Sequence, residues 1–252
     1  MTADVTLGDA ALARRLAESA GALLLVVQRS GLFEGKALGC AGDRVANAFL
    51  IEAIRARRPG DAILSEEEKD DAGRLAARRV WIVDPLDGSR EYGEGRTDWA
   101  VHVALSIDGA PAHGAVALPG LALTLCSGRP ACVPAQEGPL RLLVSRSRPA
   151  ADALAVAEAL GAELVPMGSA GAKAMAVVRG EADIYFHSGG QYEWDNCAPA
   201  AVALAAGLHA SRIDGTPLRY NRPDKYLPDL LICRPAIAER VLATIRTLCP
   251  RG

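Results

Sequence analysis

Hydrophobic side chains near the N-terminus repeat with the spacing of a helix. Between residues 12 and 27 they recur every three or four positions, which predicts an amphipathic helix with one buried face. The same spacing over residues 45–54 predicts a second helix, which Pro59-Gly60 ends. Residues 33–42, between these helices, are rich in glycine, so we expect a loop there.

The middle of the chain changes to short apolar runs of the kind that form strands. Residues 62–65 and 79–83 are each predicted to be a strand, and Asp84-Pro85 closes the second one. Asp-Gly and Pro-Gly turns separate the next three apolar runs, which is typical of an antiparallel meander. These runs are residues 99–108, 113–118 and 121–127.

The second half of the chain alternates between strand-like and helix-like segments. Strands are predicted at 140–145, 163–166, 182–186 and 229–233, and helices at 150–160, 170–179, 194–206 and 236–248. This alternation favours a sheet covered on both faces. The segment 131–139 is rich in proline and glycine, so we expect an α+β lobe over 1–138 and an α/β lobe over 139–252.

Composition narrows the range of functions. The chain has 252 residues, half of them hydrophobic, and its 28 basic and 30 acidic residues nearly balance. Such a chain can bury a core and is not disordered, and without a basic excess a nucleic-acid polymer is not an expected partner. The apolar run 20–27 is too short to span a bilayer, and no export signal is evident. We therefore expect a cytoplasmic protein that does not contact a membrane.

The cysteines and histidines are scattered rather than grouped. None of the six cysteines stands in a C-x-x-C pair, which argues against a zinc knuckle or a redox dithiol. The four histidines show no H-x-x-x-H spacing. We therefore expect His102, His113, His187 and His209 to be structural or surface residues.

The richest chemical signal is the sequence DPLDGS, directly after the second predicted strand. Asp84 and Asp87 stand three residues apart, and the proline between them turns the chain, so that both carboxylates and the Leu86 carbonyl can face one point. Such oxygen atoms suit a hard cation such as Mg²⁺. The backbone N–H groups of Gly88 and Ser89 could hold a phosphate oxygen. The same sequence is also compatible with an ordinary turn.

Two further acidic segments stand where predicted elements begin or end. Glu66 and Glu67 follow the strand at 62–65, where an acidic run is otherwise most often a solvated surface feature. Asp195 opens a helix of small residues, where an aspartate is by default an N-cap. Ends of elements can converge at one edge of a fold, so these acids are candidates for the same site as Asp84 and Asp87.

Taken in chain order, these three motifs resemble those of the inositol monophosphatase superfamily. The motifs are Ser-Glu-Glu after a strand, Asp-Pro-Leu-Asp-Gly-Ser, and Glu-Trp-Asp before a small-residue helix, and the likeness extends over residues 7–248. That family comprises Mg²⁺-dependent, lithium-sensitive phosphomonoesterases. The resemblance implies a layered α/β/α/β/α sandwich of two lobes with the active site between them, and a homodimer.

The resemblance also implies a role for individual residues. The metal ligands for two or three Mg²⁺ ions would be Glu66, Asp84, the Leu86 carbonyl, Asp87 and Asp195, with Asp43 near a third ion. Gly88 and Ser89 match the phosphate-binding turn, and Glu66 and Ser89 would orient the attacking water, with Glu67 close by. The residues implied beside the substrate are Ser145, Arg146, Lys173, Arg219 and Asp195.

Finer features point to one branch of the superfamily. The run from Asp87 to Tyr92, DGSREY, is similar to the signature of the CysQ-type 3′-phosphoadenosine 5′-phosphate phosphatases. This implies hydrolysis of the 3′-phosphate of that nucleotide, and of its sulfated form, in sulfate assimilation. Two alternatives stay open. One is a broader phosphatase for inositol 1-phosphate or fructose 1,6-bisphosphate, and the other is a non-catalytic protein that senses a metal or a nucleotide.

Overall fold

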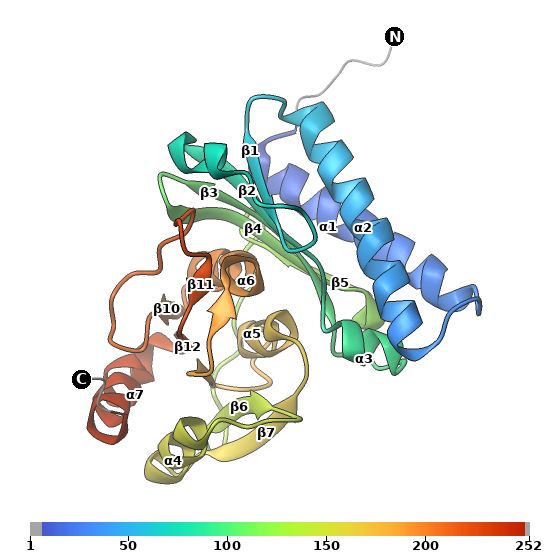
Figure 1. Cartoon of the computed structure of the whole chain (residues 1–252). Coiled ribbons are helices and arrows are strands. Elements are labelled where there is room, and N and C mark those ends of the chain that lie inside the picture. Colours follow the sequence, from blue (N-terminus) through green and yellow to red (C-terminus); the bar gives the residue numbers. More distant parts are fainter. Residues whose placement is uncertain (1–6, 250–252) are drawn as a thin grey trace.

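Five layers of alternating helices and sheets make up the protein. The computed structural model describes residues 7–249. Figure 1 shows the order: the helices α1 (Asp9–Arg29) and α2 (Gly35–Arg57), a first sheet, the helices α5 (Ala170–Val178) and α6 (Glu193–Ala205), a second sheet, and the helices α4 (Ala151–Leu160) and α7 (Pro235–Leu248). The α/β/α/β/α sandwich implied by the resemblance is therefore confirmed.

The first sheet has five strands in the order of the chain, β1-β2-β3-β4-β5. Its strands are β1 (Ala62–Ser65), β2 (Arg79–Asp87), β3 (Ala100–Ile107), β4 (Ala110–Leu118) and β5 (Leu123–Cys126). The pair β1–β2 is parallel and the other three pairs are antiparallel, which confirms the predicted meander. Asp84 of β2 pairs directly with His102 of β3, and the register then shifts between Asp84 and Asp87.

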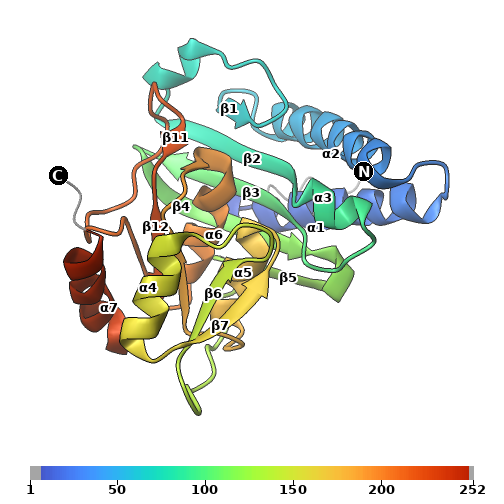
Figure 2. The ribbon, with the colours of Figure 1, turned by 60° about the horizontal axis from the view of Figure 1, so that its bottom comes forward.

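The second sheet has the order β10-β12-β8-β6-β7. Its strands are β6 (Arg141–Ser145), β7 (Glu163–Met167), β8 (Ile184–His187), β10 (His209–Ser211) and β12 (Leu230–Cys233). Strand β6 pairs in parallel with β7 and β8, whereas β12 is antiparallel to β8 and β10. Figure 2 shows α4 and α7 on the side of this sheet that faces away from α1 and α2.

The central helix layer joins the two sheets. Helix α6 contacts β2, β3 and β4 of the first sheet and β10 and β12 of the second. Its small buried residues, among them Ala198, Ala200 and Ala201, let it lie close to both sheets. A backbone atom approaches so near that a Cβ on Gly114 of β4 would come within 2.8 Å of the Ala198 carbonyl oxygen. The site described below lies at the N-terminal ends of these two central helices.

The glycine-rich segment at 33–42 was wrongly predicted as a loop. Helix α2 begins at Gly35 and includes the whole segment from there. Close packing explains the glycines, because a Cβ on Gly42 would lie 2.9 Å from the Tyr92 ring, and one on Gly39 would lie 3.1 Å from the Ser89 carbonyl oxygen. Gly39 and Gly42 are therefore typical here of close helix contact, whereas Gly35 takes a left-handed φ of 50° where the helix begins.

Two boundaries near the acidic motifs also differ from the prediction. Strand β2 continues through Pro85 to Asp87 by means of the register shift, because Pro85 has no N–H to donate and an irregularity accommodates it. Helix α6 begins at Glu193 with Tyr192 as its N-cap, so Asp195 is the third helical residue and not the N-cap.

The remaining expectations have mixed outcomes. All of β1–β5 precede residue 138 and all of the second sheet follows it, but the division into lobes at 138/139 stays a prediction. Over residues 7–249, no helix combines the length and apolarity needed to cross a bilayer. Cys40, Cys126, Cys132, Cys197 and Cys233 are free, and Cys126, Cys197 and Cys233 are buried.

Candidate metal and phosphate site

Three aspartates from two distant parts of the chain meet in one pocket. Asp84 and Asp87 come from the end of β2, and Asp195 comes from the first turn of α6. One carboxylate oxygen of each lies within 4.8 Å of those of the other two. Mg²⁺ binds oxygen at about 2.1 Å, so two oxygens on one ion lie up to about 4.2 Å apart, and the observed spacing is close to that limit. The predicted convergence of these acids is therefore observed.

Local hydrogen bonds hold two of these carboxylates in place. The backbone N–H of Leu86 donates to Asp84 at 3.0 Å, within the irregular end of β2. The backbone N–H of Tyr192 donates to Asp195 at 2.6 Å, which closes the first turn of α6. These contacts fix the two side chains at the end of β2 and at the start of α6.

Asp87 is bound by the N-terminus of α5. Its carboxylate accepts from the backbone N–H groups of Ala170 at 3.1 Å and Gly171 at 2.6 Å, and from the Ser169 hydroxyl. His102 lies on its other side, with Nε2 3.2 Å from Oδ2. Burial alone would raise the pKa of Asp87, but the positive charge of His102 and these hydrogen bonds together lower it to about 2.

The pKa values of the neighbouring acids Asp84, Glu66 and Asp195 are raised, in contrast to that of Asp87. Burial and the neighbouring charges of Glu66 and Asp87 raise the pKa of Asp84 well above its usual value. Burial, followed by repulsion from Asp195, raises the pKa of Glu66 to about 7, and burial with repulsion from Asp87 raises the pKa of Asp195 to about 6. So many acids in one pocket favour a bound cation, which would remove the repulsion. The oxygen-only ligand set suits Mg²⁺.

The end of β1 brings the second acidic motif to the same place. The Ser65 hydroxyl donates to Asn47 of α2 at 2.8 Å, and Asn47 donates to Glu68 at 2.7 Å, so α2 fixes the loop that carries Glu66. Asp43, one turn earlier in α2, lies close enough to Glu67 that repulsion adds to burial and raises the pKa of Asp43 to about 7. The acids of β1, β2, α2 and α6 thus form one continuous group.

A cleft of about 350 Å³ opens beside these acids. Gly88 takes the left-handed conformation, with φ of 90°, and caps the short helix α3 (Ser89–Gly93). The cleft is lined by Asp87, Gly88, Ser89, Ser145, Arg146, Lys173 and Asp195, among others. The structure therefore brings together Gly88 and Ser89, the turn that the resemblance implies for phosphate, with three of the four basic or polar residues implied beside the substrate.

Comparison with known proteins agrees with this geometry. The model of the inositol monophosphatase family matches residues 34–248. This chain belongs to the inositol monophosphatase family. A protein of Mycobacterium leprae named 3′-phosphoadenosine 5′-phosphate phosphatase is 52% identical, over 95% of this chain and 94% of its own length. The 3′(2′),5′-bisphosphate nucleotidase CysQ of Escherichia coli is 29% identical, over 74% of this chain and 81% of its own.

Solved structures of the family share the fold. CysQ from Bacteroides thetaiotaomicron aligns with a TM-score of 0.77 at 23% identity, covering 90% of this chain and 97% of its own. Inositol monophosphatase II from Staphylococcus aureus aligns with a TM-score of 0.79 at 18% identity, covering 95% of each chain. At these identities the likeness concerns the fold, which agrees with the five layers described above.

The family resemblance also implied that Arg219 lies beside the substrate, but the structure places it away from the cleft. Arg219 is exposed and lines a separate cavity of about 310 Å³ with His209 and Ser211. The backbone beside it is held to the β3–β4 turn, where the Tyr220 N–H donates to the Gly109 carbonyl at 3.0 Å. This contact keeps Arg219 out of the cleft that Arg146 and Lys173 line.

Sequence reasoning missed one residue at the acids. His102 was expected to be a structural or surface histidine, yet it is fully buried against Asp87. Only the β2–β3 register, which sets His102 opposite Asp84, could have pointed to it. That register is not readable from the residues around position 102.

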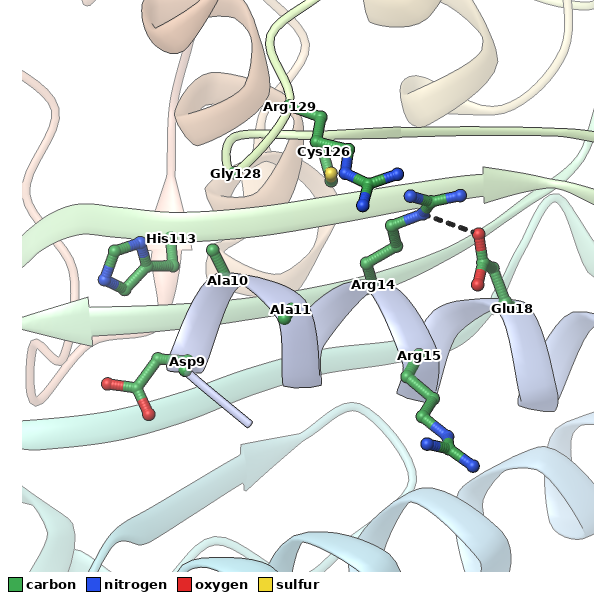
Figure 3. A pocket seen from close by; sticks show the side chains of 11 residues that line it. Asp9, Ala10, Ala11, Arg14, Arg15, Glu18, His113, Cys126, Gly128 and Arg129 are labelled. Atoms are coloured by element: carbon green, nitrogen blue, oxygen red, sulfur yellow. Dashed lines mark hydrogen bonds and ion pairs between the residues drawn. The ribbon is translucent and has the colours of Figure 1, made fainter. Parts of the chain in front are cut away.

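A larger cavity of about 680 Å³ lies away from the acids of this family site. Figure 3 shows it between the start of α1 and the end of β5, where Arg14 and Arg129 approach each other over Cys126. Arg14 is paired with Glu18 at 2.7 Å. The lining of this cavity holds two scattered carboxylates, Asp9 and Glu18. The cavity shares no lining residue with the 350 Å³ cleft, so it does not extend the candidate site.

Proposed function

We propose that this protein is a Mg²⁺-dependent phosphatase that hydrolyses the 3′-phosphate of 3′-phosphoadenosine 5′-phosphate and of its sulfated form. The observation that carries the proposal is the meeting of the Asp84, Asp87 and Asp195 carboxylates beside the Gly88–Ser89 turn. The identity of 52% to a phosphatase named for this nucleotide supports the substrate. The reaction would belong to sulfate assimilation, where it removes a by-product.

The acidic residues would hold the metal. Asp84, Asp87, Asp195, Glu66 and the Leu86 carbonyl would bind two or three Mg²⁺ ions, with Asp43 next to this group. Bound Mg²⁺ would supply an activated water and neutralise the charge of the phosphate. The high pKa values of Asp84, Glu66 and Asp195 support this assignment, because they are the signature of acids that lack a counter-charge.

The residues of the turn, together with Glu66, would orient the attacking water and bind the phosphate. Glu66 and the Ser89 hydroxyl would orient the attacking water, and Glu66, with Glu67 close by, would take its proton. The backbone N–H groups of Gly88 and Ser89 would hold the oxygens of the transferred phosphoryl group as charge develops. Attack in line with the leaving 3′-oxygen needs no covalent intermediate.

The second phosphate of the substrate would be bound on the far side of the cleft. Ser145 and Arg146, at the end of β6, and Lys173 of α5 line that side. The Arg146 guanidinium forms ion pairs with Glu91 at 3.0 Å and with Glu94 at 2.9 Å. These ion pairs fix it at the edge of the cleft. Lys173 is buried, and its Nζ donates to the Ser169 carbonyl at 2.6 Å. Its ammonium group would therefore contribute positive charge from the α5 wall of the cleft.

We further propose a cytoplasmic homodimer. The dimer rests on the family resemblance alone and is tested by light scattering, where the expected mass is twice 26.3 kDa.

Phosphate release tests the function directly. The protein would be given 3′-phosphoadenosine 5′-phosphate, inositol 1-phosphate and fructose 1,6-bisphosphate at equal concentration, with and without Mg²⁺. We expect release only with Mg²⁺ and the highest kcat/KM for the nucleotide. Higher kcat/KM for the sugar phosphates would favour the broader phosphatase. Tight nucleotide binding without release would favour the non-catalytic sensor.

A further inference from the structure

His102 occupies an enclosed position at the junction of three elements. It lies on β3 and has no exposed surface. Its imidazole contacts Asp87 of β2 and the backbone of α6, and it packs against the start of α5. A Cβ on Gly171, in the first turn of α5, would come within 2.0 Å of the His102 Nε2. The absence of a side chain at Gly171 is therefore what lets the ring reach this position.

Both ring nitrogens of His102 face oxygen acceptors. Nδ1 lies 3.0 Å from the backbone carbonyl oxygen of Trp194, within hydrogen-bond geometry. Nε2 lies 3.2 Å from Oδ2 of Asp87, which is an ion-pair distance but not a hydrogen bond. A carbonyl and a carboxylate can only accept, so each contact is favourable when the nitrogen carries its proton. One side chain thus connects a metal-binding carboxylate of β2 to the residue that precedes Asp195 in α6.

The first turn of α6 needs such a support from outside the helix. Pro199 has no N–H, so the Asp195 carbonyl lacks its normal helical donor four residues later. The turn is held instead by the Tyr192 N–H, which donates to Asp195, and by His102 at the Trp194 carbonyl. A contact at Trp194 therefore restrains the direction in which the Asp195 side chain points.

We propose that His102 is a positioning residue, which ties Asp87 to the first turn of α6 and so fixes the separation between the Asp87 and Asp195 carboxylates. Asp87 stands on β2 and Asp195 on α6, and His102 contacts Asp87 itself and the Trp194 carbonyl next to Asp195. This inference rests on the proposed function in one respect, namely that Asp87 and Asp195 are ligands of the same metal centre.

Two substitutions separate the two contacts. In His102→Asn the amide nitrogen replaces Nδ1, so the contact with Trp194 is kept and the contact with Asp87 is lost. In His102→Gln the amide nitrogen replaces Nε2, so the contact with Asp87 is kept and the contact with Trp194 is lost. Ser106→Ala is the matched control, because Ser106 is buried on the same strand and its hydroxyl has no partner among the described residues.

The main readout is the affinity of the metal-free protein for Mn²⁺, measured by electron paramagnetic resonance. We expect each single-contact variant to bind Mn²⁺ about 10–100-fold more weakly than wild type, as is common when the support of a metal ligand is removed. Ser106→Ala should bind Mn²⁺ as wild type does. With saturating metal, kcat for the nucleotide should fall in both histidine variants while KM changes little.

The outcomes distinguish this inference from the proposed function. If His102→Asn and His102→Gln fold and bind Mn²⁺ within twofold of wild type, His102 is a core residue and the inference is overturned. If wild type binds Mn²⁺ but releases no phosphate, the proposed function fails while the binding comparison still decides the role of His102.

A measurement on wild-type protein covers the case in which the variants do not fold. Nitrogen NMR of histidine-labelled protein with Mg²⁺ present should show a proton on Nε2 of His102 that exchanges slowly with water. An Nε2 without a proton would face the Asp87 carboxylate with a lone pair and could not attract it, and that result would overturn the inference without any variant.

Discussion

The strongest quantitative prediction concerns Asp195 in the absence of metal. Its pKa is raised to about 6, first by burial and then by the charge of Asp87. The unfolded chain ionises this group near 3.8, so the folded state holds the proton more tightly. The stability linked to this proton is complete below pH 4 and is lost as the pH rises through about 6. Replacing Asp195 by Asn should therefore stabilise the metal-free protein at pH 8.

The size of the effect follows from the pKa difference. A shift of roughly 2 pKa units corresponds to about 3 kcal/mol in the free energy of unfolding at pH 8. At pH 4 the same difference falls below about 1 kcal/mol, because Asp195 is then protonated in the folded state and roughly half protonated in the unfolded state. Asn keeps the oxygen that accepts from the Tyr192 N–H, so the turn of α6 should survive the change.

Thermal and urea unfolding at pH 4 and pH 8, with a chelator present, test this. At pH 8 the melting temperature of Asp195→Asn should lie roughly 6–12 °C above that of wild type. Asp183→Asn is the control, because Asp183 is buried but bonds Arg234 at 2.7 Å, and its neutralisation should destabilise by about 3 kcal/mol or more. A variant of Asp195 that is no more stable than wild type at pH 8 would refute the idea of repelling acids. Added Mg²⁺ should raise the stability of wild type more than that of the variant.

Three further changes have defined outcomes. Asp84→Asn should lose at least about 100-fold in kcat with an unchanged circular dichroism spectrum, and wild-type turnover would contradict the assigned site. Arg146→Ala should raise KM for the bisphosphate nucleotide about tenfold and leave KM for inositol 1-phosphate unchanged, whereas Arg219→Ala should alter neither, since Arg219 lies outside the cleft. Ser169→Ala, which removes both the hydroxyl bound to Asp87 and the N-cap of α5, should lower the free energy of unfolding by about 1–2 kcal/mol in urea.

Much of the local structure could be read from the residues themselves. The spacing of apolar positions predicts α1, the strands of the meander and the helices of the second half, because each of these elements is stabilised by neighbours a few residues away. The segment 33–42 was mispredicted because Gly39 and Gly42 serve contacts with α3, Leu24 and Leu86, far from them along the chain. A glycine selected by a distant neighbour has the same local appearance as a glycine selected by a turn.

The same distinction applies to the site. The residue types and the order of the acidic motifs were available from the sequence, since each motif is a local run at the end of an element. The tertiary structure decided that Asp84, Asp87 and Asp195 converge within 4.8 Å. It also decided that Arg219 lines a separate cavity and that His102 lies between Asp87 and Trp194. Those three depend on which strands pair and which helices pack between the sheets. Pairing and packing join residues separated by more than a hundred positions, such as Asp84 and Asp195, and no local pattern in the chain records such contacts.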